Sequence, residues 1–377
     1  MKQMVLMLEY LQEGYSMKRI LILANNDVGL YNFRKELIEE LIKQKFQVYI
    51  SLPYGKKVDL LTNIGCIFID TKIDRRGTNP IKDLKLLIEY FKIIKKVNPD
   101  VVLTYTIKPN IYGGIVCRKM KKKCIANVTG LGSSSESKSF ISKLIERMYK
   151  YAFKYNHCIF CQNKENLDYL KKLGINSNAL KLIPGSGVNI NKYKVLEYPN
   201  DKIIRFLFIS RIMKSKGIDE YLATAKVIKS KYKNTEFNIL GYCEEDYQGK
   251  LKEYEKKGII KYHGMQDDII PFLKKSHCTI HPTYYPEGMS NVLLESAASG
   301  RPIITTNRSG CKEIIDNSIN GFLVKEKDSE NLIKITEKFI NLPNKEKRQM
   351  GLEGRKKIEK EFDRNIVISE YMKEISE

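Results

Sequence analysis

The chain of 377 residues has no apolar run of about 18 residues, so we expect no transmembrane helix. Its opening segment, 1–17, lacks the basic start and the small-residue cleavage site of a signal peptide. Two interpretations of that segment stay open: a helix ahead of the first strand, or an extension upstream of a natural start at Met17. The chain also lacks a recognised RNA- or DNA-binding motif and the G-x-G-x-x-G loop of a nicotinamide or flavin site.

Cysteines number only eight and follow no disulfide framework, which predicts a reducing, cytoplasmic environment. His157, Cys158 and Cys161 stand together and resemble half of a metal site. Their segment has the pattern of a strand, in which positions three apart face opposite sides, and no second pair follows at zinc spacing. We therefore interpret these cysteines as structural and expect no metal site.

Acidic residues are scarce in one part of the chain. The formal net charge is +22, and residues 1–190 hold 32 Lys/Arg against 16 Asp/Glu, whereas the remainder holds 34 against 28. A basic half implies an anionic partner, which leaves nucleic acid, a membrane surface and phosphorylated substrates open.

The chain is too long for one ordinary domain, and its 42% hydrophobic content supports packed cores. Short apolar runs alternate with helical segments, which predicts parallel sheets covered on both faces. The alternation breaks near 195–200, so we expect two doubly wound, Rossmann-like domains, 17–194 and 195–359, with ligands in a cleft between them. The predicted strands are 18–24, 46–52, 101–105, 159–162, 203–209, 236–240, 259–263, 278–281, 302–306 and 321–324.

Two glutamates, Glu287 and Glu295, stand eight positions apart around the start of an apolar helix. The helix N-terminus offers free N–H groups and the positive end of a dipole, which suits a phosphate. Taken alone, this spacing also fits an ordinary amphipathic helix with a glutamate at each end. Four residues between the two glutamates would line the phosphate site: Gly288, Met289, Ser290 and Asn291.

The stretch resembles the Glu-x7-Glu motif of family 4 retaining glycosyltransferases, which have the two-domain GT-B fold. The resemblance implies that Glu287 contacts the hydroxyls of the donor sugar and that Glu295 binds the ribose. It also implies that a last helix, within about 360–377, crosses back to the acceptor-side domain 17–194, while 195–359 binds the nucleotide sugar. No Asp-x-Asp motif occurs, so we expect neither a metal nor another cofactor.

Arg211 and Lys216 follow the first strand of the second half and resemble the Arg-x4-Lys element of the same family. There the pair neutralises the donor diphosphate, which is also the leaving group. Without a metal, two cations must stabilise the charge that develops on the departing UDP. The other interpretation is a basic loop in a lysine-rich protein.

Several glycines lie at positions where we expect the backbone to approach a nucleotide. Gly29 lies in the first strand-to-helix turn, interpreted as a phosphate-facing loop, 25–29, ahead of a helix at 30–43. Gly187 lies in a segment resembling the family's Pro-Asn-Gly-Val-Asp, with two departures. Gly264 and Met265 follow a strand where the family holds the base, and their backbone groups are predicted to contact the base edge.

Three residues are predicted on the acceptor side. Lys108 is the only cation in the loop after the strand 101–105, where many family members have a histidine. Its expected partner is either the donor phosphate or an acceptor diphosphate. Thr129 and Gly130 belong to 127–132, which resembles the Gly-Leu-Gly acceptor loop of capsule and O-antigen sugar transferases. A simple glycine-rich turn explains the same residues equally well.

The segment 139–155 is predicted to be a basic amphipathic helix, with Lys143, Arg147, Lys150 and Lys154 along it. Such a helix lies on an anionic bilayer in some proteins and packs its apolar side on its own core in others. Both interpretations stay open, and the basic run 118–123 favours the bilayer.

These features and the resemblance together predict a metal-independent glycosyltransferase, cytoplasmic and peripheral on the inner face of the cell membrane. The resemblance alone implies that the enzyme retains the configuration of the donor. The enzyme would move a hexose or N-acetylhexosamine from a UDP-sugar to a saccharide on undecaprenyl diphosphate. A UDP-N-acetylglucosamine 2-epimerase on the same fold is one rival, and product analysis without acceptor separates the two. A nucleic-acid-binding protein is the other, and steeply salt-dependent binding to random DNA would support it.

Overall fold

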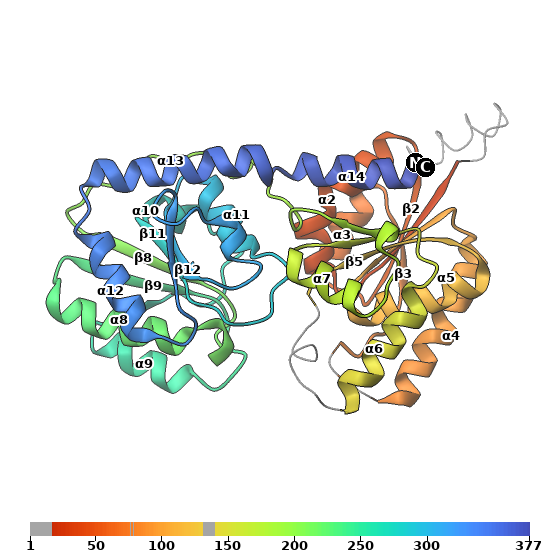
Figure 1. The fold of residues 1–377 in the computed structure, drawn as a ribbon, viewed down its shortest axis with the longest axis horizontal. Helices are drawn as coiled ribbons and strands as arrows, with labels where there is room; N and C mark the ends of the chain where they lie inside the picture. The colour runs from red at the N-terminus through yellow and green to blue at the C-terminus, as the bar shows by residue number, and fades with distance from the viewer. Residues whose placement is uncertain (1–16, 76, 78, 131–139) are drawn as a thin grey trace. The chain divides into compact units, whose positions relative to one another are not determined.

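The computed structural model describes residues 17–75, 77, 79–130 and 140–377, which form two compact units (Figure 1). Unit 1 comprises Met1–Ser186 and Val367–Glu377, and unit 2 comprises Gly187–Ile366. The sequence pattern placed the junction at 194–195 instead. Residues from 187 onward group with unit 2 because the Val188 N–H donates to the Phe362 carbonyl at 2.9 Å and the Val188 carbonyl accepts from the Arg364 N–H at 3.0 Å.

Unit 1 is built on a parallel seven-stranded sheet in the order β3-β2-β1-β4-β5-β6-β7. Its strands are β1 (Arg19–Leu23), β2 (Gln47–Leu52), β3 (Ile67–Asp70), β4 (Val101–Tyr105), β5 (Lys123–Val128), β6 (Cys158–Cys161) and β7 (Leu180–Leu182). Its helices are α2 (Asp27–Lys43), α3 (Lys56–Ile64), α4 (Pro80–Val97), α5 (Gly114–Met120), α6 (Phe140–Phe153) and α7 (Lys164–Lys172), with a π-helical turn at Pro109–Gly113.

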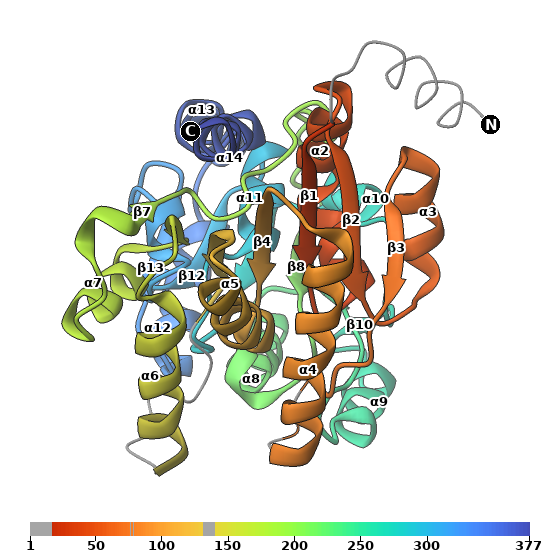
Figure 2. The same ribbon diagram turned by 90° about the vertical axis from the view of Figure 1, so that its right-hand side faces the viewer.

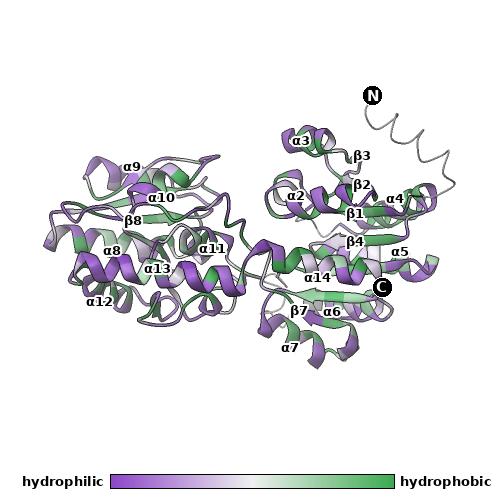
Figure 3. Ribbon diagram, turned by 90° about the horizontal axis from the view of Figure 1, so that it is seen from above, coloured by the Kyte–Doolittle hydropathy of each residue, from purple (hydrophilic) through white to green (hydrophobic). Residues whose placement is uncertain are grey.

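Helices cover both faces of this sheet. The side chains of α4, α5 and α6 pack on one face, and those of α2, α3 and the C-terminal helix α14 (Arg364–Ser376) pack on the other. The strands are coloured hydrophobic along β1 and β4 in Figure 3, which fits strands buried on both faces.

Unit 2 is built on a parallel six-stranded sheet in the order β10-β9-β8-β11-β12-β13. Its strands are β8 (Ile204–Ile209), β9 (Thr235–Leu240), β10 (Lys261–Tyr262), β11 (Cys278–His281), β12 (Ile303–Thr306) and β13 (Gly321–Val324). Its helices are α8 (Ile218–Lys231), α9 (Gln248–Lys256), α10 (Ile270–Lys275), α11 (Asn291–Ala298), α12 (Ser329–Ile340) and α13 (Asn344–Glu361). The prediction of two doubly wound, parallel α/β domains is confirmed.

Capping residues explain where helices begin, and one of them corrects the sequence prediction. Asp27, Val28 and Gly29 were predicted to form a loop, but they form the first turn of α2, because the Asn26 side chain accepts a hydrogen bond from the Gly29 N–H. Helix α4 starts at Pro80, where the Asn79 side chain caps it.

Within the described residues, none of the helices combines the length and the apolar character that crossing a bilayer requires. All eight cysteines are free, and Cys158 and Cys161 lie buried in β6.

Candidate active site

The two motif glutamates lie on either side of the N-terminus of α11 in unit 2. Glu287 belongs to the loop between β11 and α11, and Glu295 lies in the second turn of the helix. Ser290 caps α11 without a side-chain hydrogen bond, and its N–H donates to the Gly310 carbonyl at 2.8 Å. The helix therefore starts with backbone N–H groups that its cap residue leaves available to an anion.

The structure brings Lys216 and Arg211 together over one aromatic ring and pairs Lys216 with Glu287. The Lys216 ammonium forms an ion pair with Glu287, although 71 positions separate the two residues. The Tyr285 ring centroid lies 4.5 Å from Lys216 Nζ and 5.2 Å from Arg211 Cζ. Both cations can therefore interact favourably with the face of the ring.

Charges around this cluster shift the pKa values of its members. Burial raises the pKa of Glu287, but the Lys216 ammonium more than offsets this, so the pKa is lowered from its usual value. Lys216 itself is 6% exposed. Burial also acts against the charge of Arg211, but Glu244, whose Oε2 accepts from Arg211 Nη1 at 2.8 Å, holds its pKa above the usual value. Glu287 and Arg211 are thus both ionised at neutral pH.

His281 was not among the predicted residues, yet it lies under this cluster at the end of β11. Its ring is 2% exposed, and neither ring nitrogen has a hydrogen-bond partner among the described residues. Burial, followed by the positive charge of Lys216, lowers its pKa to about 4. His281 is therefore neutral at physiological pH, and nothing in its spacing along the chain distinguishes it from an ordinary strand residue.

Gly217 shapes the turn that holds Lys216. Its φ is +79°, and a Cβ atom there would lie 2.2 Å from the Pro282 carbonyl oxygen. A side chain would therefore push the Lys216 turn away from the strand end that leads to Glu287.

We predict that Gly217→Ala lowers the free energy of unfolding by about 2–4 kcal/mol, because it adds a steric clash to the cost of positive φ. Gly258→Ala is the matched control: Gly258 has φ +66° with open space around its Cα, so only about 1 kcal/mol should be lost. Urea unfolding followed by circular dichroism measures both. Equal losses in the two variants would contradict a tight contact at Gly217.

Among the described residues, Glu295 forms no ion pair like that of Glu287 with Lys216, although Lys192 and Arg364 lie near enough to favour its charged form. Its half-buried carboxylate accepts a hydrogen bond from the Tyr193 hydroxyl, but burial dominates and raises its pKa to about 7. Tyr193 was not predicted from the sequence, although it lies shortly after the Gly187 segment. At neutral pH, Glu295 is therefore divided between its protonated and ionised forms.

If Glu295 binds ribose hydroxyls as a carboxylate, affinity for a nucleotide sugar should rise by up to about tenfold from about pH 6 to pH 8 and level off above. The reason is that only the ionised fraction of Glu295 accepts both hydrogen bonds. A UDP-sugar is the suitable ligand, because its diphosphate carries no proton that titrates in this range. Calorimetry across the range measures the effect, and Glu295→Gln should flatten it. A pH dependence that survives in Glu295→Gln belongs to another group.

Residues 288–291, between the two glutamates, would contact a bound phosphate through their backbone N–H groups. Met289 is 6% exposed, and its side chain packs in the core beneath α11. Gly288 is buried, and the Asn291 side-chain oxygen is buried without a hydrogen-bond partner in the described structure. Further along, the Gly264 carbonyl accepts from the Gly241 N–H at 2.8 Å, whereas Met265 is exposed.

Two predicted glycines are explained by contacts within the chain. The Gly29 N–H, expected to face a phosphate, already donates to Asn26 Oδ1 at 2.6 Å. Gly187 has φ +60°, and a Cβ atom there would lie 2.6 Å from the Cα of Arg364, so the close backbone approach alone requires glycine. Neither observation supplies a nucleotide contact.

On the acceptor side, Lys108 is not a free cation. Its Nζ lies 2.5 Å from Asp83 Oδ1 of α4, and both side chains are largely buried. Thr129 and Gly130 follow β5 directly and are half-buried. Asn127 and Val128, which were also predicted in this loop, form the end of β5, and positions 131 and 132 lie outside the described residues.

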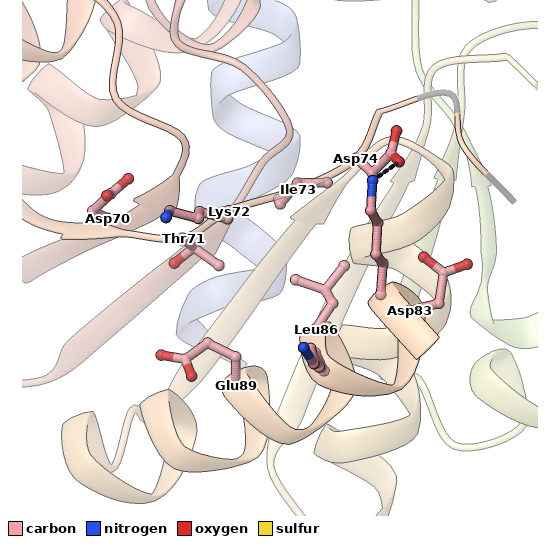
Figure 4. A pocket seen from close by; sticks show the side chains of 10 residues that line it. Asp70, Thr71, Lys72, Ile73, Asp74, Asp83, Leu86 and Glu89 are labelled. Atoms are coloured by element: carbon pink, nitrogen blue, oxygen red, sulfur yellow. Dashed lines mark hydrogen bonds and ion pairs between the residues drawn. The ribbon is translucent and has the colours of Figure 1, made fainter. Parts of the chain in front are cut away.

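Beside Asp83, unit 1 has a cavity of about 780 Å³ between the end of β3 and helix α4 (Figure 4). Its wall alternates carboxylates and ammonium groups, and Lys82 Nζ lies 3.1 Å from Asp74 Oδ2. Such a wall can both donate to and accept from sugar hydroxyls. The lining residues are Asp70, Thr71, Lys72, Ile73, Asp74, Lys82, Asp83, Lys85, Leu86 and Glu89.

One group of side chains in the described part of unit 1 has the composition of a metal site: His157, Glu374 and Glu377. Lys181 forms an ion pair with Glu374, which already compensates its charge. This group contains none of the residues predicted to bind the donor.

Comparison with known proteins decides the family. The family described as "Glycosyl transferase 4-like" matches residues 19–163, and "Glycosyl transferases group 1" matches residues 190–357. The chain belongs to the glycosyltransferases. Glu287, Glu295, Arg211 and Lys216 all lie within the second matched region.

Curated relatives match this glycosyltransferase over nearly its whole length. It is 28% identical over 373 residues to the N,N'-diacetylbacillosaminyl-diphospho-undecaprenol alpha-1,3-N-acetylgalactosaminyltransferase of Campylobacter jejuni, covering 94% of this chain and 97% of the relative. It is 25% identical to the UDP-Gal:alpha-D-GlcNAc-diphosphoundecaprenol alpha-1,3-galactosyltransferase of Escherichia coli, covering 86% and 89%.

Solved structures show the same fold at lower identity. The Anabaena protein HepE in complex with UDP and glucose superposes with a TM-score of 0.77 at 17% identity, over 96% of this chain and all of that one. WaaG, a glycosyltransferase involved in lipopolysaccharide biosynthesis, gives 0.71 at 14% identity, over 93% and 98%. These likenesses show that the glycosyltransferase has the GT-B fold.

Proposed function

We propose that this glycosyltransferase transfers a hexose or N-acetylhexosamine, with retention of configuration, from a UDP-sugar to a saccharide carried on undecaprenyl diphosphate. The observation that carries the proposal is the cluster of Lys216 and Arg211 over Tyr285, with Glu287 paired to Lys216. Two cations beside a helix N-terminus match the negative charge of a diphosphate, and a carboxylate next to them can accept hydrogen bonds from sugar hydroxyls. The names of the Campylobacter and Escherichia relatives support the lipid-linked acceptor.

In the proposed reaction, the diphosphate lies at the N-terminus of α11, where backbone N–H groups, Arg211 and Lys216 bind it. Lys216 exchanges its ion pair with Glu287 for the phosphate, and Glu287 accepts hydrogen bonds from the sugar hydroxyls. Glu295 binds the ribose. The bond between the anomeric carbon and the diphosphate oxygen breaks, and UDP leaves with the electron pair.

The acceptor hydroxyl attacks the anomeric carbon from the side that UDP leaves, and its proton passes to the departing diphosphate. Arg211 and Lys216 stabilise the charge that develops there, so the proposal requires no metal ion. We propose the cavity beside α4 as the place where the acceptor saccharide binds, because its carboxylates and ammonium groups suit hydroxyls. A lipid-linked acceptor implies that the protein works at the cytoplasmic face of the membrane.

A panel of UDP- and GDP-sugars tests the proposal, first for hydrolysis and then for transfer to lipid-linked acceptors. We expect a UDP-hexose or UDP-N-acetylhexosamine to be used, and nuclear magnetic resonance of the product to show the anomeric configuration of the donor. Transfer from GDP-sugars alone, or an inverted product, would overturn the assignment. A donor converted to its epimer without acceptor would instead favour an epimerase.

A further inference from the structure

Helix α4 carries a row of exposed apolar side chains on the side that faces away from the sheet. Because these residues are spaced three and four apart, they lie on one face of the helix. The opposite face packs into the core through Leu86, Tyr90, Ile93, Ile94 and Val97. The exposed row consists of Ile81 (66% exposed), Leu84 (57%), Ile88 (47%) and Phe91 (37%).

Helices α5 and α6 lie on the same side of the sheet as α4, in the foreground of Figure 2, and they extend this surface. Leu144, Tyr151 and Tyr155, along and just beyond α6, are also exposed. Arg118 at the end of α5 places its guanidinium carbon 3.9 Å from the Tyr151 ring centroid and 4.7 Å from that of Tyr155. Tyrosine side chains, which have an apolar ring and a polar hydroxyl, are typical of a membrane–water interface.

Positive charge surrounds the apolar row. Residues 80–97, 118–123 and 143–154 together hold fourteen Lys/Arg and three Asp/Glu. Two of the three acidic side chains are already engaged: Asp83 pairs with Lys108, and Glu146 accepts from the Tyr169 hydroxyl. The lysines that flank the apolar row on α4 are Lys85, Lys92, Lys95 and Lys96, all exposed.

We propose that this α4–α6 face, defined by the three segments above, inserts its apolar side chains into an anionic bilayer. The inference rests on the proposed lipid-linked acceptor and goes beyond it by naming the surface and the depth of contact. The charges attract anionic headgroups, and the apolar row of α4 enters the boundary between headgroups and acyl chains. The sequence left a bilayer contact open for the helix 139–155, favoured by the basic run 118–123, and gave no such role to α4.

Charge distinguishes the bilayer from the other possible occupants of this face. A second copy of the chain would bring two strongly positive surfaces together, which opposes dimerisation through it. A nucleic acid would satisfy the lysines but would leave Ile81, Leu84 and Ile88 without apolar contacts. An anionic bilayer satisfies both components of the surface.

The chain contains no tryptophan, so a single introduced tryptophan reports on one position. We expect the fluorescence of Ile88→Trp and of Leu84→Trp to shift to shorter wavelength with phosphatidylglycerol vesicles, and to be quenched by brominated acyl chains. Phosphatidylcholine vesicles should cause neither effect. The matched control is Ile319→Trp, at a similarly exposed isoleucine of unit 2, which should stay unchanged with both lipids.

Vesicle co-sedimentation of two further variants distinguishes the contribution of the basic residues to binding from that of the inserted apolar row. Ile88→Asn, which changes no charge, and Lys143→Glu/Lys150→Glu should each lower affinity for phosphatidylglycerol vesicles by about tenfold or more, and high salt should release the wild type. Lys252→Glu/Lys256→Glu on α9 carries the same charge change in unit 2 and should have no comparable effect. Unchanged circular dichroism shows that each variant is folded.

Insertion is overturned if the tryptophans at 84 and 88 do not shift, or if they shift with protein concentration in the absence of vesicles, which indicates self-association. Binding to random DNA that survives physiological salt and competes with vesicles would also overturn it. Failure of the proposed function gives a different result, since transfer and UDP binding would then be absent while the vesicle signals persist.

Discussion

Glu287→Gln is expected to lower the rate of sugar transfer by about 100-fold or more and to leave UDP affinity nearly unchanged. The amide has almost the same shape as the carboxylate and can still accept a hydrogen bond from Lys216. It lacks the negative charge that the Lys216 ammonium stabilises, as the lowered pKa of Glu287 indicates. Because Glu287 is proposed to contact the sugar and not the nucleotide, the loss should fall on turnover.

Transfer rates and calorimetry with UDP, measured on the same preparation, test this expectation. Glu337→Gln is the matched control, since Glu337 forms a surface ion pair with Lys231 in the same unit. That variant should behave like the wild type in both measurements. Wild-type turnover in Glu287→Gln would remove Glu287 from the site, and a parallel loss of UDP affinity would place it at the diphosphate.

Lys216→Ala and Arg211→Ala should each lower turnover by about 100-fold or more and should also weaken UDP binding. Both side chains lie against Tyr285 and are proposed to face the diphosphate, which bears charge in the ground state and more in the transition state. Lys216→Ala should have the larger effect, because it also leaves the Glu287 carboxylate without its cation in a site that burial already disfavours.

Initial rates and UDP titrations measure these variants, with Lys231→Ala as a surface control. Losses below about threefold in both variants would mean that the loop is only basic surface. EDTA should leave the wild-type rate unchanged, since these two cations are proposed to take the role of a metal. A rate that falls with EDTA and returns with a divalent ion would contradict that proposal.

The parallel architecture followed from short apolar runs alternating with helices, but three strands were missed. β3 and β7 are short and only partly buried, so their apolar pattern is weak. β5 follows a run of lysines, and its end, Asn127 and Val128, was interpreted as loop. Each is recognisable only from its pairing with a neighbouring strand. At α2, the capping role of Asn26 outweighed the loop character of the residues after it.

The sequence pointed to Glu287, Glu295, Arg211 and Lys216 as candidates for the proposed donor site, because each pair lies in a short motif that resembles one of the family. Tertiary structure decided their partners: Lys216 with Glu287, Arg211 with Glu244, and Lys108 with Asp83. It also decided that one motif glutamate has a lowered pKa and the other a raised one. The physical reason is that a charge responds to whatever lies within a few ångströms, and in a parallel α/β fold those neighbours come from strand ends far apart in the chain.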